Sequence, residues 1–438
     1  MKSSPRKPAL AILNAALKAA DPIEAVLRHL SVRNGILNAG SQRYKLAAFQ
    51  KIYVVGAGKA SASMAVAVER LLGKQITEGY VNVKYGHLAR LRRIHLNECG
   101  HPVPDENGVR GAQEEGHIAA KAGKNDLLLF LVSGGASALL PFPAQPITLA
   151  EKQEVTGLLL RSGANINEMN AVRKHISSLK GGQLAGLANP ASVVSLILSD
   201  VIGDRLDVIG SGPTAPDSST FQDAQAILEK YDLTDQVPDS VSERIKDGIR
   251  GIIPETPKQV TRTQNIVVGS NQLALNAAAA EARRLGYRPM ILSSSIEGET
   301  REVARMHAAI AREIVTFGRP SKAPTCVISG GETTVAIKGE GKGGRNQEFA
   351  LAAAIDIQDL PGVCILSAGT DGTDGPTDAA GALCDNTTIA RAASERLDPK
   401  AFLNRNDSYH FFKALGDLIQ TGPTGTNVMD VRLMVINR

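Results

Sequence analysis

Two basic residues, Lys59 and Arg345, each follow a glycine-rich turn at a predicted helix start. Lys59 stands in the segment GAGKAS, directly after the short apolar run Ile52–Val55, which predicts a strand, a tight turn and a helix. Arg345 follows the second of two glycine turns in the stretch Ser329–Leu351. Consecutive glycines let several backbone N–H groups point into one concavity, and a helix N-terminus adds partial positive charge there. Each turn is therefore a candidate anion cradle with a cation at its rim.

A third glycine turn, SGGASALL, begins directly after the apolar run Leu127–Val132. Its second serine can cap the helix that follows, and its backbone N–H groups can bind phosphate. An ordinary surface turn explains any one of these segments equally well, so the prediction depends on their joint occurrence. The candidate residues for binding nucleotide, phosphate or substrate lie in or beside these turns, with one further basic residue: Gly56, Gly58, Ser133, Gly134, Gly135, Ser137, Arg173, Ser329, Gly330, Gly331, Glu332, Asn346 and Gln347.

The segment GAGKAS completes neither of the common nucleotide-binding motifs. A P-loop would need glycine at Tyr53 and Ser or Thr at Ala60. A dinucleotide fingerprint would need a third glycine at Ser61, and the next predicted strand ends at Lys84, where an NAD site has an acid for the ribose. What remains is a lysine at the mouth of a strand–helix turn, where a flexible ammonium can reach a phosphate oxygen. A solvated lysine at a helix start is the alternative.

Aspartates follow two of the predicted buried strands, Val193–Leu198 and Gly362–Ser367. Open α/β sheets place ligands at the carboxyl ends of their strands, and Mg²⁺ prefers carboxylate oxygens. Asx turns account for most such aspartates, so we assign only Asp204 and Asp371 as candidate metal ligands.

These features together describe phosphoryl transfer. That reaction asks a protein mainly to position two anions and to neutralise charge on the moving group, which cations, backbone N–H groups and Mg²⁺ provide. A carboxylate-bearing substrate would use similar cations. His101 and His175 are candidates for acid–base work, although a structural or exposed histidine is the commoner case.

The chain is predicted to form two domains, because 438 residues exceed one ordinary core of about 100 to 200 residues. Strands alternate with helices, and a composition with 43% hydrophobic and 4% aromatic residues is typical of an α/β protein. The segment IIPETPKQVTRTQ has two prolines and little periodicity, so we place the boundary there. The prediction is two Rossmann-like α/β domains, residues 1–257 and 258–438, the second of which opens with the strand Asn265–Gly269.

Charge and cysteine usage argue against several classes of protein. The net charge is +5, but the basic residues are dispersed and aromatic residues are scarce, so no nucleic-acid partner is expected. No apolar segment approaches the roughly 18 residues that span a bilayer, and Asn14 and Lys18 make the N-terminal segment an amphipathic helix rather than a signal peptide. The four cysteines lack CxxC spacing, so we expect reduced thiols in a cytoplasmic protein.

Seven segments in this order resemble the class II glycerate 2-kinases, the family with a C-terminal MOFRL domain. The likeness covers roughly residues 5 to 435, and the seven segments are specific jointly rather than singly. The segments are VVGAGKAS, GHPVPDENG, LVSGGASALLPFP, MNAVRKHISSLKGGQLA, SDVIGDRLDVIGSGPTAPD, SGGETTVAIKGEGKGGRNQEFALA and SAGTDGTDGPTDAAGA.

The resemblance implies a two-domain α/β enzyme with its active site in an interdomain cleft, converting D-glycerate and ATP to 2-phosphoglycerate and ADP with Mg²⁺. It also implies that Lys59 and Arg345 are catalytic, because they stand at the family's lysine and arginine positions. The resemblance does not assign individual metal ligands. The same family has often been labelled hydroxypyruvate reductase, a function that the incomplete dinucleotide fingerprint argues against.

Three function classes remain open at this point: a glycerate kinase, a nicotinamide-dependent hydroxypyruvate reductase, and a non-catalytic sugar-phosphate sensor. A kinase forms ADP only when glycerate is present, a reductase consumes NADH or NADPH, and a sensor binds without turnover. The sequence also leaves open whether the chain forms a homodimer.

Overall fold

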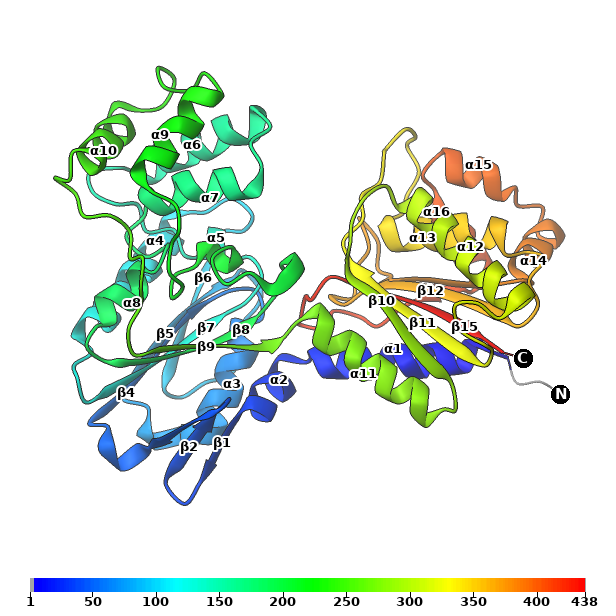
Figure 1. Cartoon of the computed structure of the whole chain (residues 1–438), viewed down its shortest axis with the longest axis horizontal. Coiled ribbons are helices and arrows are strands. Elements are labelled where there is room, and N and C mark those ends of the chain that lie inside the picture. Colours follow the sequence, from blue (N-terminus) through cyan, green and yellow to red (C-terminus); the bar gives the residue numbers. More distant parts are fainter. Residues whose placement is uncertain (1–3, 438) are drawn as a thin grey trace. The chain divides into compact units, whose positions relative to one another are not determined.

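The computed structural model describes residues 4–437 of the 438-residue chain, which fold into two compact units. Pro22–Val268 form the first unit. The chain up to Asp21 and the chain from Gly269 onwards form the second. Each unit contains helices and its own six-stranded sheet, which confirms the predicted pair of α/β units. Figure 1 labels the elements of both.

We name the two units after the basic residues that the sequence singled out. The unit Pro22–Val268 carries Lys59 and is called the lysine unit. The other carries Arg345 and is called the arginine unit.

The sheet of the lysine unit has the strand order β6-β5-β4-β7-β8-β9, and the pairings from β6 to β8 are all parallel. Counted from β4, this is the order 3-2-1-4-5-6 of the Rossmann fold, which reverses direction between β4 and β7. Ligands of such sheets bind outside the carboxyl ends of the strands at this reversal. The strands are β4 (Lys51–Ala57), β5 (Glu78–Lys84), β6 (Ile94–Cys99), β7 (Asp126–Val132), β8 (Ser192–Leu198) and β9 (Thr263–Gly269).

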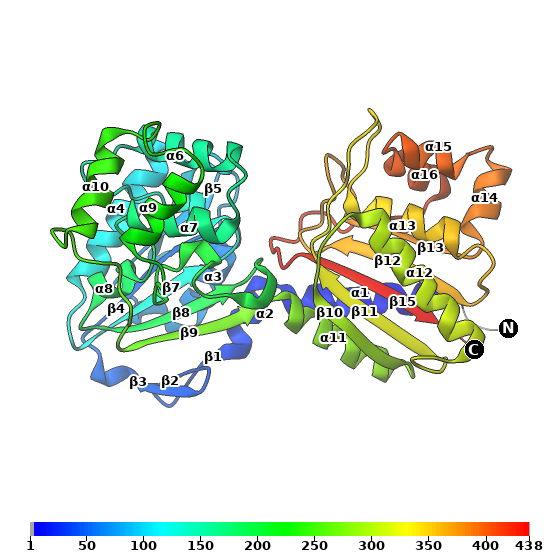
Figure 2. The same ribbon diagram turned by 45° about the horizontal axis from the view of Figure 1, so that its top comes forward.

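The central strand β7 is buried along its whole length, as a parallel sheet covered on both faces requires. Helices of this unit pack against the sheet, and α6, α7, α9 and α10 lie together with a core of their own (Figure 2). A small antiparallel sheet is formed by β1 (Leu30–Arg33), β2 (Ile36–Ala39) and β3 (Gln42–Lys45). The helices are α2 (Pro22–His29), α3 (Ser61–Leu72), α4 (Glu106–Lys121), α5 (Ala136–Leu139), α6 (Leu149–Arg161), α7 (Ile166–His175), α8 (Gln183–Ala188), α9 (Phe221–Lys230) and α10 (Asp239–Ile249).

The strand β9 lies at the edge of the lysine unit's sheet, beside β8. The sequence predicted that this strand opens the second domain after residue 257, whereas the division between the units falls after Val268. Backbone pairing explains the difference, because the Val193 N–H of β8 donates to the carbonyl of Arg262, directly before β9, at 2.9 Å. A strand that pairs across a sheet belongs to that sheet, whatever the composition of the loop before it.

The sheet of the arginine unit is mixed rather than parallel, and so departs from a fully Rossmann-like second domain. Its order is β10-β11-β15-β12-β13-β14, and only β10 and β11 pair in parallel. The C-terminal strand β15 enters between β11 and β12, antiparallel to both. The strands are β10 (Arg288–Ile296), β11 (Thr325–Gly331), β12 (Val363–Gly369), β13 (Gly381–Asp385), β14 (Leu418–Ile419) and β15 (Asp430–Ile436).

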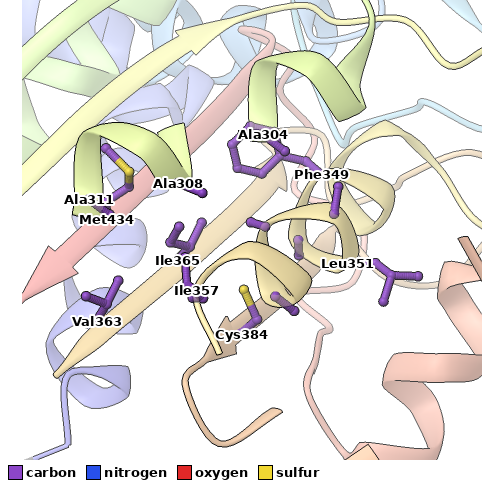
Figure 3. Packing of buried hydrophobic residues seen from close by; sticks show 14 of the residues in the cluster. Ala304, Ala308, Ala311, Phe349, Leu351, Ile357, Val363, Ile365, Cys384 and Met434 are labelled. Carbon is purple, nitrogen blue, oxygen red and sulfur yellow. The ribbon is translucent and has the colours of Figure 1, made fainter. Parts of the chain in front are cut away.

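Alanine faces let the helices of the arginine unit pack closely on this sheet. Ala304, Ala308 and Ala311 lie at helical spacing on one side of α12, and all are buried (Figure 3). Phe349 of α13 and Met434 of β15 belong to the same core. The helices are α1 (Arg6–Ala20), α11 (Asn271–Arg284), α12 (Thr300–Phe317), α13 (Arg345–Asp356), α14 (Thr388–Ser394), α15 (Pro399–Asn404) and α16 (Ser408–Leu415).

The N-terminal helix α1 packs within the arginine unit, against α11 and β15 (Figure 1). Ile12, Leu13 and Ala16 form part of its buried stripe, which is the amphipathic pattern that the sequence predicted. Arg6 pairs with two carboxylates of that unit, Asp385 and Asp417. A segment at the beginning of the chain thus completes a unit built mostly from its end.

All four cysteines, Cys99, Cys326, Cys364 and Cys384, are buried free thiols, and burial raises the pKa of each. Within residues 4–437, none of the helices combines the length and the apolarity needed to cross a bilayer.

Replacing Arg6 by Ala should lower the free energy of unfolding by about 2 kcal/mol, because it leaves two buried carboxylates with fewer partners. The loss should fall below that of a fully buried pair, since Asp417 keeps its ion pair with Arg391. Urea unfolding measures the change, and Lys7→Ala, at an exposed position of the same helix, is the matched control. Equal stabilities of the two variants would contradict this role of Arg6.

Candidate active site

Lys59 lies in the turn between β4 and α3, at the reversal of the strand order. Its backbone N–H donates to the Gly134 carbonyl at 2.9 Å, which ties this turn to the turn after β7. Gly58 makes the approach possible: its φ is +145°, and a Cβ there would lie 2.1 Å from Ser133 Oγ. The structure therefore brings two of the predicted glycine turns together, with Lys59 half-buried beside them.

His101 and Asp200 approach the same turns from the ends of β6 and β8. A Cβ on Gly135, whose φ is +85°, would lie 2.8 Å from the His101 ring and 3.5 Å from Lys59 Cγ. A Cβ on Gly134 would lie 2.3 Å from Asp200 Oδ2. Burial, and then the charge of Lys59, lowers the pKa of His101, so its imidazole is neutral near pH 7.

Other predicted residues of the lysine unit serve the packing of these turns. The Ser133 hydroxyl accepts from the Ala60 N–H at 3.0 Å at the start of α3, so it is engaged within the protein. A Cβ on Gly56 would lie 2.3 Å from the Leu131 carbonyl oxygen, which makes this glycine a requirement of strand packing. His175 is buried, and both of its ring nitrogens are hydrogen-bonded within the protein.

Arg345 is the first residue of α13, and the buried carboxylate of Asp430 fixes its guanidinium. Nε and Nη2 of Arg345 donate to the two oxygens of Asp430 at 2.8 and 3.0 Å, and Nη1 pairs with Glu332 at 2.8 Å. Burial alone would lower the pKa of Arg345, but the hydrogen bonds and charge of Asp430 more than offset this and raise it. The side chain is 31% exposed, so an anion from solution can reach it.

The predicted anion cradle at the start of α13 is filled by the protein itself. The N–H groups of Asn346 and Gln347 donate to the carboxylate of Asp374 at 3.0 and 2.8 Å. Asp374 thus uses the N-terminal donors and the partial positive charge that would otherwise attract a phosphate. Burial, with a contribution from the charge of Asp430, raises the pKa of Asp374 to about 6.

The predicted glycine turn that precedes α13 in the sequence is not open to a ligand either. Ser329, Gly330 and Gly331 are buried residues of β11 rather than an open loop. The Ser329 hydroxyl is 2.8 Å from His307 Nε2. A Cβ on Gly330 would lie 1.8 Å from Asn271 Oδ1. The absence of a side chain at this glycine therefore lets α11 pack close to the sheet. These residues are therefore part of the buried sheet rather than of an open binding turn.

A hollow of about 620 Å³ lies beside Arg345 in the arginine unit. Asp371, a predicted metal ligand, lines it together with Glu332 and Thr373. One oxygen of Asp371 accepts from the Thr373 N–H at 3.0 Å, the Asx turn that commonly explains such an aspartate.

The two predicted metal ligands belong to different units, Asp204 to the lysine unit and Asp371 to the arginine unit. In the part of the chain that the structure describes, no three His, Cys, Asp or Glu residues are grouped so as to hold a metal ion. A cage built only of protein ligands is not what Mg²⁺ requires, since it is usually held by substrate phosphates with one or two carboxylates.

The sequence reasoning missed three residues that the structure places beside predicted ones: Asp430, which orients Arg345, and Lys152 and Lys180, which lie near Arg173. Asp374 is one of the aspartates that follow a predicted strand, but its contact with the start of α13 was not predicted. Asp430 reaches Arg345 only through tertiary pairing, so nothing local marks it. Lys180 directly precedes a double glycine, so a lysine beside a glycine turn is the signal that could have singled it out.

A Rossmann-order sheet with a cation at its reversal is a framework that binds nucleotides and other anions. Comparison with known proteins identifies the family. The chain matches the family described as a domain of unknown function (DUF4147) over residues 8–246, and the MOFRL family over residues 325–430.

Relatives match over nearly the whole length. The chain is 42% identical over 433 residues to a glycerate 2-kinase of Pyrococcus horikoshii, covering 98% of this chain and 97% of that protein. It is 42% identical to a protein of Agrobacterium vitis provisionally named a hydroxypyruvate reductase, covering 97% and 93%. The crystal structure of a glycerate kinase of Thermotoga maritima has a TM-score of 0.89 at 41% identity, covering 98% and 99%. The chain belongs to the MOFRL-domain glycerate kinase family.

Replacing Gly58 by Ala should lower the free energy of unfolding by about 3 kcal/mol or more and should reduce turnover, because the new Cβ overlaps Ser133 and displaces Lys59. Gly416→Ala is the matched control: φ is +69° and ψ is 26° there, in the left-handed region, but nothing lies within 4 Å of the new Cβ. That control should cost only about 1 kcal/mol, for backbone strain alone. Calorimetry and a turnover assay on both variants check the expectation, and equal losses would show that the packing of the two turns is unimportant.

Proposed function

We propose that this protein transfers the γ-phosphoryl group of ATP to the 2-hydroxyl of D-glycerate, giving 2-phosphoglycerate and ADP. Family membership and the name of the Pyrococcus horikoshii relative support the reaction. The observation that carries the proposal is a pair of positioned cations, Lys59 at the reversal of a Rossmann-order sheet and Arg345 held by Asp430.

In the proposed mechanism, the 2-hydroxyl oxygen attacks the γ-phosphorus, and the bond from that phosphorus to the bridging oxygen of ADP breaks. The positive charges of Lys59 and Arg345 offset the negative charge that the phosphoryl oxygens carry during transfer. Neutral His101 is the candidate acceptor for the hydroxyl proton.

Arg345 can bind a phosphate oxygen without losing its orientation. The two N–H groups that face Asp430 hold the guanidinium, whereas Nη1 faces Glu332, whose side chain is 50% exposed. An exposed ion pair contributes little to stability, so an incoming phosphoryl oxygen can replace Glu332 at small cost.

Mg²⁺ fits this arrangement as an ion that binds together with the nucleotide rather than at a preformed site made only of protein ligands. We propose that it is held by the phosphates of ATP with a single protein carboxylate, for which Asp371 and Asp204 remain the candidates. When bound, Mg²⁺ would neutralise phosphate charge. We also propose a cytoplasmic location, where the four buried thiols would stay reduced.

The alternative, a nicotinamide-dependent hydroxypyruvate reductase, lacks the expected dinucleotide contacts. The strand β5 ends at Lys84, where an NAD site has an acid, and Ser61 occupies the third glycine position. Incubation with hydroxypyruvate and NADH or NADPH tests this function, which predicts loss of nicotinamide absorbance. A sensor would bind glycerate without forming ADP.

Replacing Lys59 or Arg345 by Ala should lower kcat by about a hundredfold to a thousandfold, because each removes a fixed charge from the transition state. A coupled ADP assay with D-glycerate, ATP and Mg²⁺ measures kcat, and NMR of the product distinguishes 2- from 3-phosphoglycerate. Lys121→Ala, which removes only an exposed ion pair with Glu78, is the control and should match the wild type. If a folded Lys59→Ala or Arg345→Ala variant kept near wild-type turnover, that residue would have no catalytic role.

A further inference from the structure

A group of basic and amide side chains, all but one of them buried, lies in the lysine unit, on α6, on α7 and in the segment after α7. We call Lys152, Asn170, Arg173 and Lys180 the basic cluster. Lys152 is 5% exposed and Asn170 is 3% exposed. Within the described residues, neither Nζ of Lys152 nor Nδ2 of Asn170 has a hydrogen-bond partner. Two buried donor groups of one region are therefore left unsatisfied.

The charges of this cluster repel one another. Burial, and then the charges of Arg173 and Arg244, lowers the pKa of Lys152 to about 7. Burial, and then Lys152 and Arg173, lowers the pKa of Lys180 well below its usual value, and burial lowers that of Arg173. A neighbouring carboxylate would shift all three in the opposite direction. The cluster thus has the electrostatics of an anion-binding site.

Hydrogen bonds connect the basic cluster to the turn that faces Lys59. Nζ of Lys180 donates to the Ser137 carbonyl at 3.0 Å, and the Ser137 and Ser211 hydroxyls are 3.1 Å apart. The Ser211 hydroxyl donates to Oδ1 of Asn170 at 3.1 Å. Ser137 stands two residues after Gly135, the glycine packed against His101 and Lys59. One loop, the turn after β7, therefore contacts both the basic cluster and Lys59.

Burying these unpaired groups lowers the free energy of unfolding of the protein unless a bound ligand offsets the cost. A buried charge without a partner costs several kcal/mol, and a buried amide donor without an acceptor adds about 1 to 3 kcal/mol. Apolar side chains of similar volume would avoid the cost. Such arrangements are retained where binding or catalysis needs them.

We propose that the basic cluster binds the carboxylate of the 2-hydroxy-acid substrate. Lys152, Arg173 and the Asn170 amide would donate to its two oxygens, while Lys180, already bonded to Ser137, positions the loop. The assignment rests on the proposed function for the identity of the acid. It goes beyond that function by separating the carboxylate site from the cations that act on the phosphoryl group.

A carboxylate fits this position better than a phosphate of ATP. It is small, planar and singly charged, so it matches the fork of a guanidinium and is cheaper to bury than a multiply charged phosphate. Lys59 is half-buried and at the strand ends, where the larger anion can approach. The cluster lies deeper, as expected for the end of a three-carbon substrate that does not react.

Replacing Lys152 by Met tests the assignment. The KM for D-glycerate should rise tenfold or more, because one charge-assisted hydrogen bond is lost, whereas the KM for ATP should stay within about twofold. The melting temperature without substrate should stay the same or increase, since an unpaired buried charge is removed. Arg173→Lys, which keeps the charge but loses the fork, should raise the KM for D-glycerate by a smaller factor.

The matched control is Lys246→Met, which removes the same charge from an exposed position of α10 and should change neither constant. A binding experiment without ATP removes the dependence on turnover. D-glycerate should raise the melting temperature of the wild type and not that of Lys152→Met, and glycerol, which has no carboxylate, should shift neither.

These outcomes separate the inference from the proposed function. If the wild type shows the glycerate-dependent shift and Lys152→Met does not, but no ADP forms, the carboxylate site stands and the kinase function fails. If glycerate is phosphorylated and Lys152→Met keeps its KM for glycerate, the kinase stands and the site fails. A rise in the KM for ATP alone would show that the cluster binds phosphate, and a lower melting temperature with unchanged KM would show a structural lysine. Either would overturn the assignment.

Discussion

The paired hydrogen bonds between Arg345 and Asp430 are the interaction on which the rest of the arginine unit's site depends. They require a carboxylate with no exposure to solvent at the first residue of β15. That residue is in place because the last strand of the chain inserts between β11 and β12. The same carboxylate accepts from Asn346 and Arg432, so it also fixes the beginning of α13 and one side of the core. A guanidinium fixed in this way acts on a transferring group with little reorganisation.

The basic side chains of the two units have neighbours of opposite charge, acidic in one unit and basic in the other. In the arginine unit, Arg345 is accompanied by Asp430, Glu332 and Asp374, so its charge is offset before any ligand arrives. In the lysine unit, burial, and then the repulsion between its members, lowers the pKa values of Lys152 and Lys180 in the basic cluster. The first arrangement favours orientation, and the second favours strong attraction for an anion. A kinase that must hold a carboxylate and neutralise a moving phosphoryl group needs both.

Local patterns predicted much of the fold and part of the site. The apolar run of β7 and the glycine turn after β4 are visible in the sequence because they obey the requirements of a parallel sheet with tight strand–helix turns. The position of Lys59 in a strand–helix turn follows from that pattern, and its catalytic role stays a prediction. Arg345 was also found, but the reason given for it was incomplete, because Asp374 fills the helix N-terminus that was expected to bind an anion.

What sequence reasoning missed depends on contacts between distant segments. Because β9 pairs with β8, the two units divide later in the chain than the predicted boundary. Because β15 inserts antiparallel between β11 and β12, the second sheet is mixed. The helix α1 joined the arginine unit through its apolar stripe and Arg6, although its sequence shows only that it is amphipathic. Lys152 also carries no local signal, because its burial depends on how α6 packs. Each of these follows from tertiary pairing that no spacing within one segment specifies.

We propose that Lys59 and Arg345 are both needed for the phosphoryl-transfer step. A double-mutant cycle on kcat/KM for glycerate phosphorylation measures this directly, using Lys59→Ala, Arg345→Ala and the variant with both changes. We expect strong non-additivity: the double variant should lose little more activity than the less active of the two single variants. Losses that simply multiply would show instead that the two cations act independently.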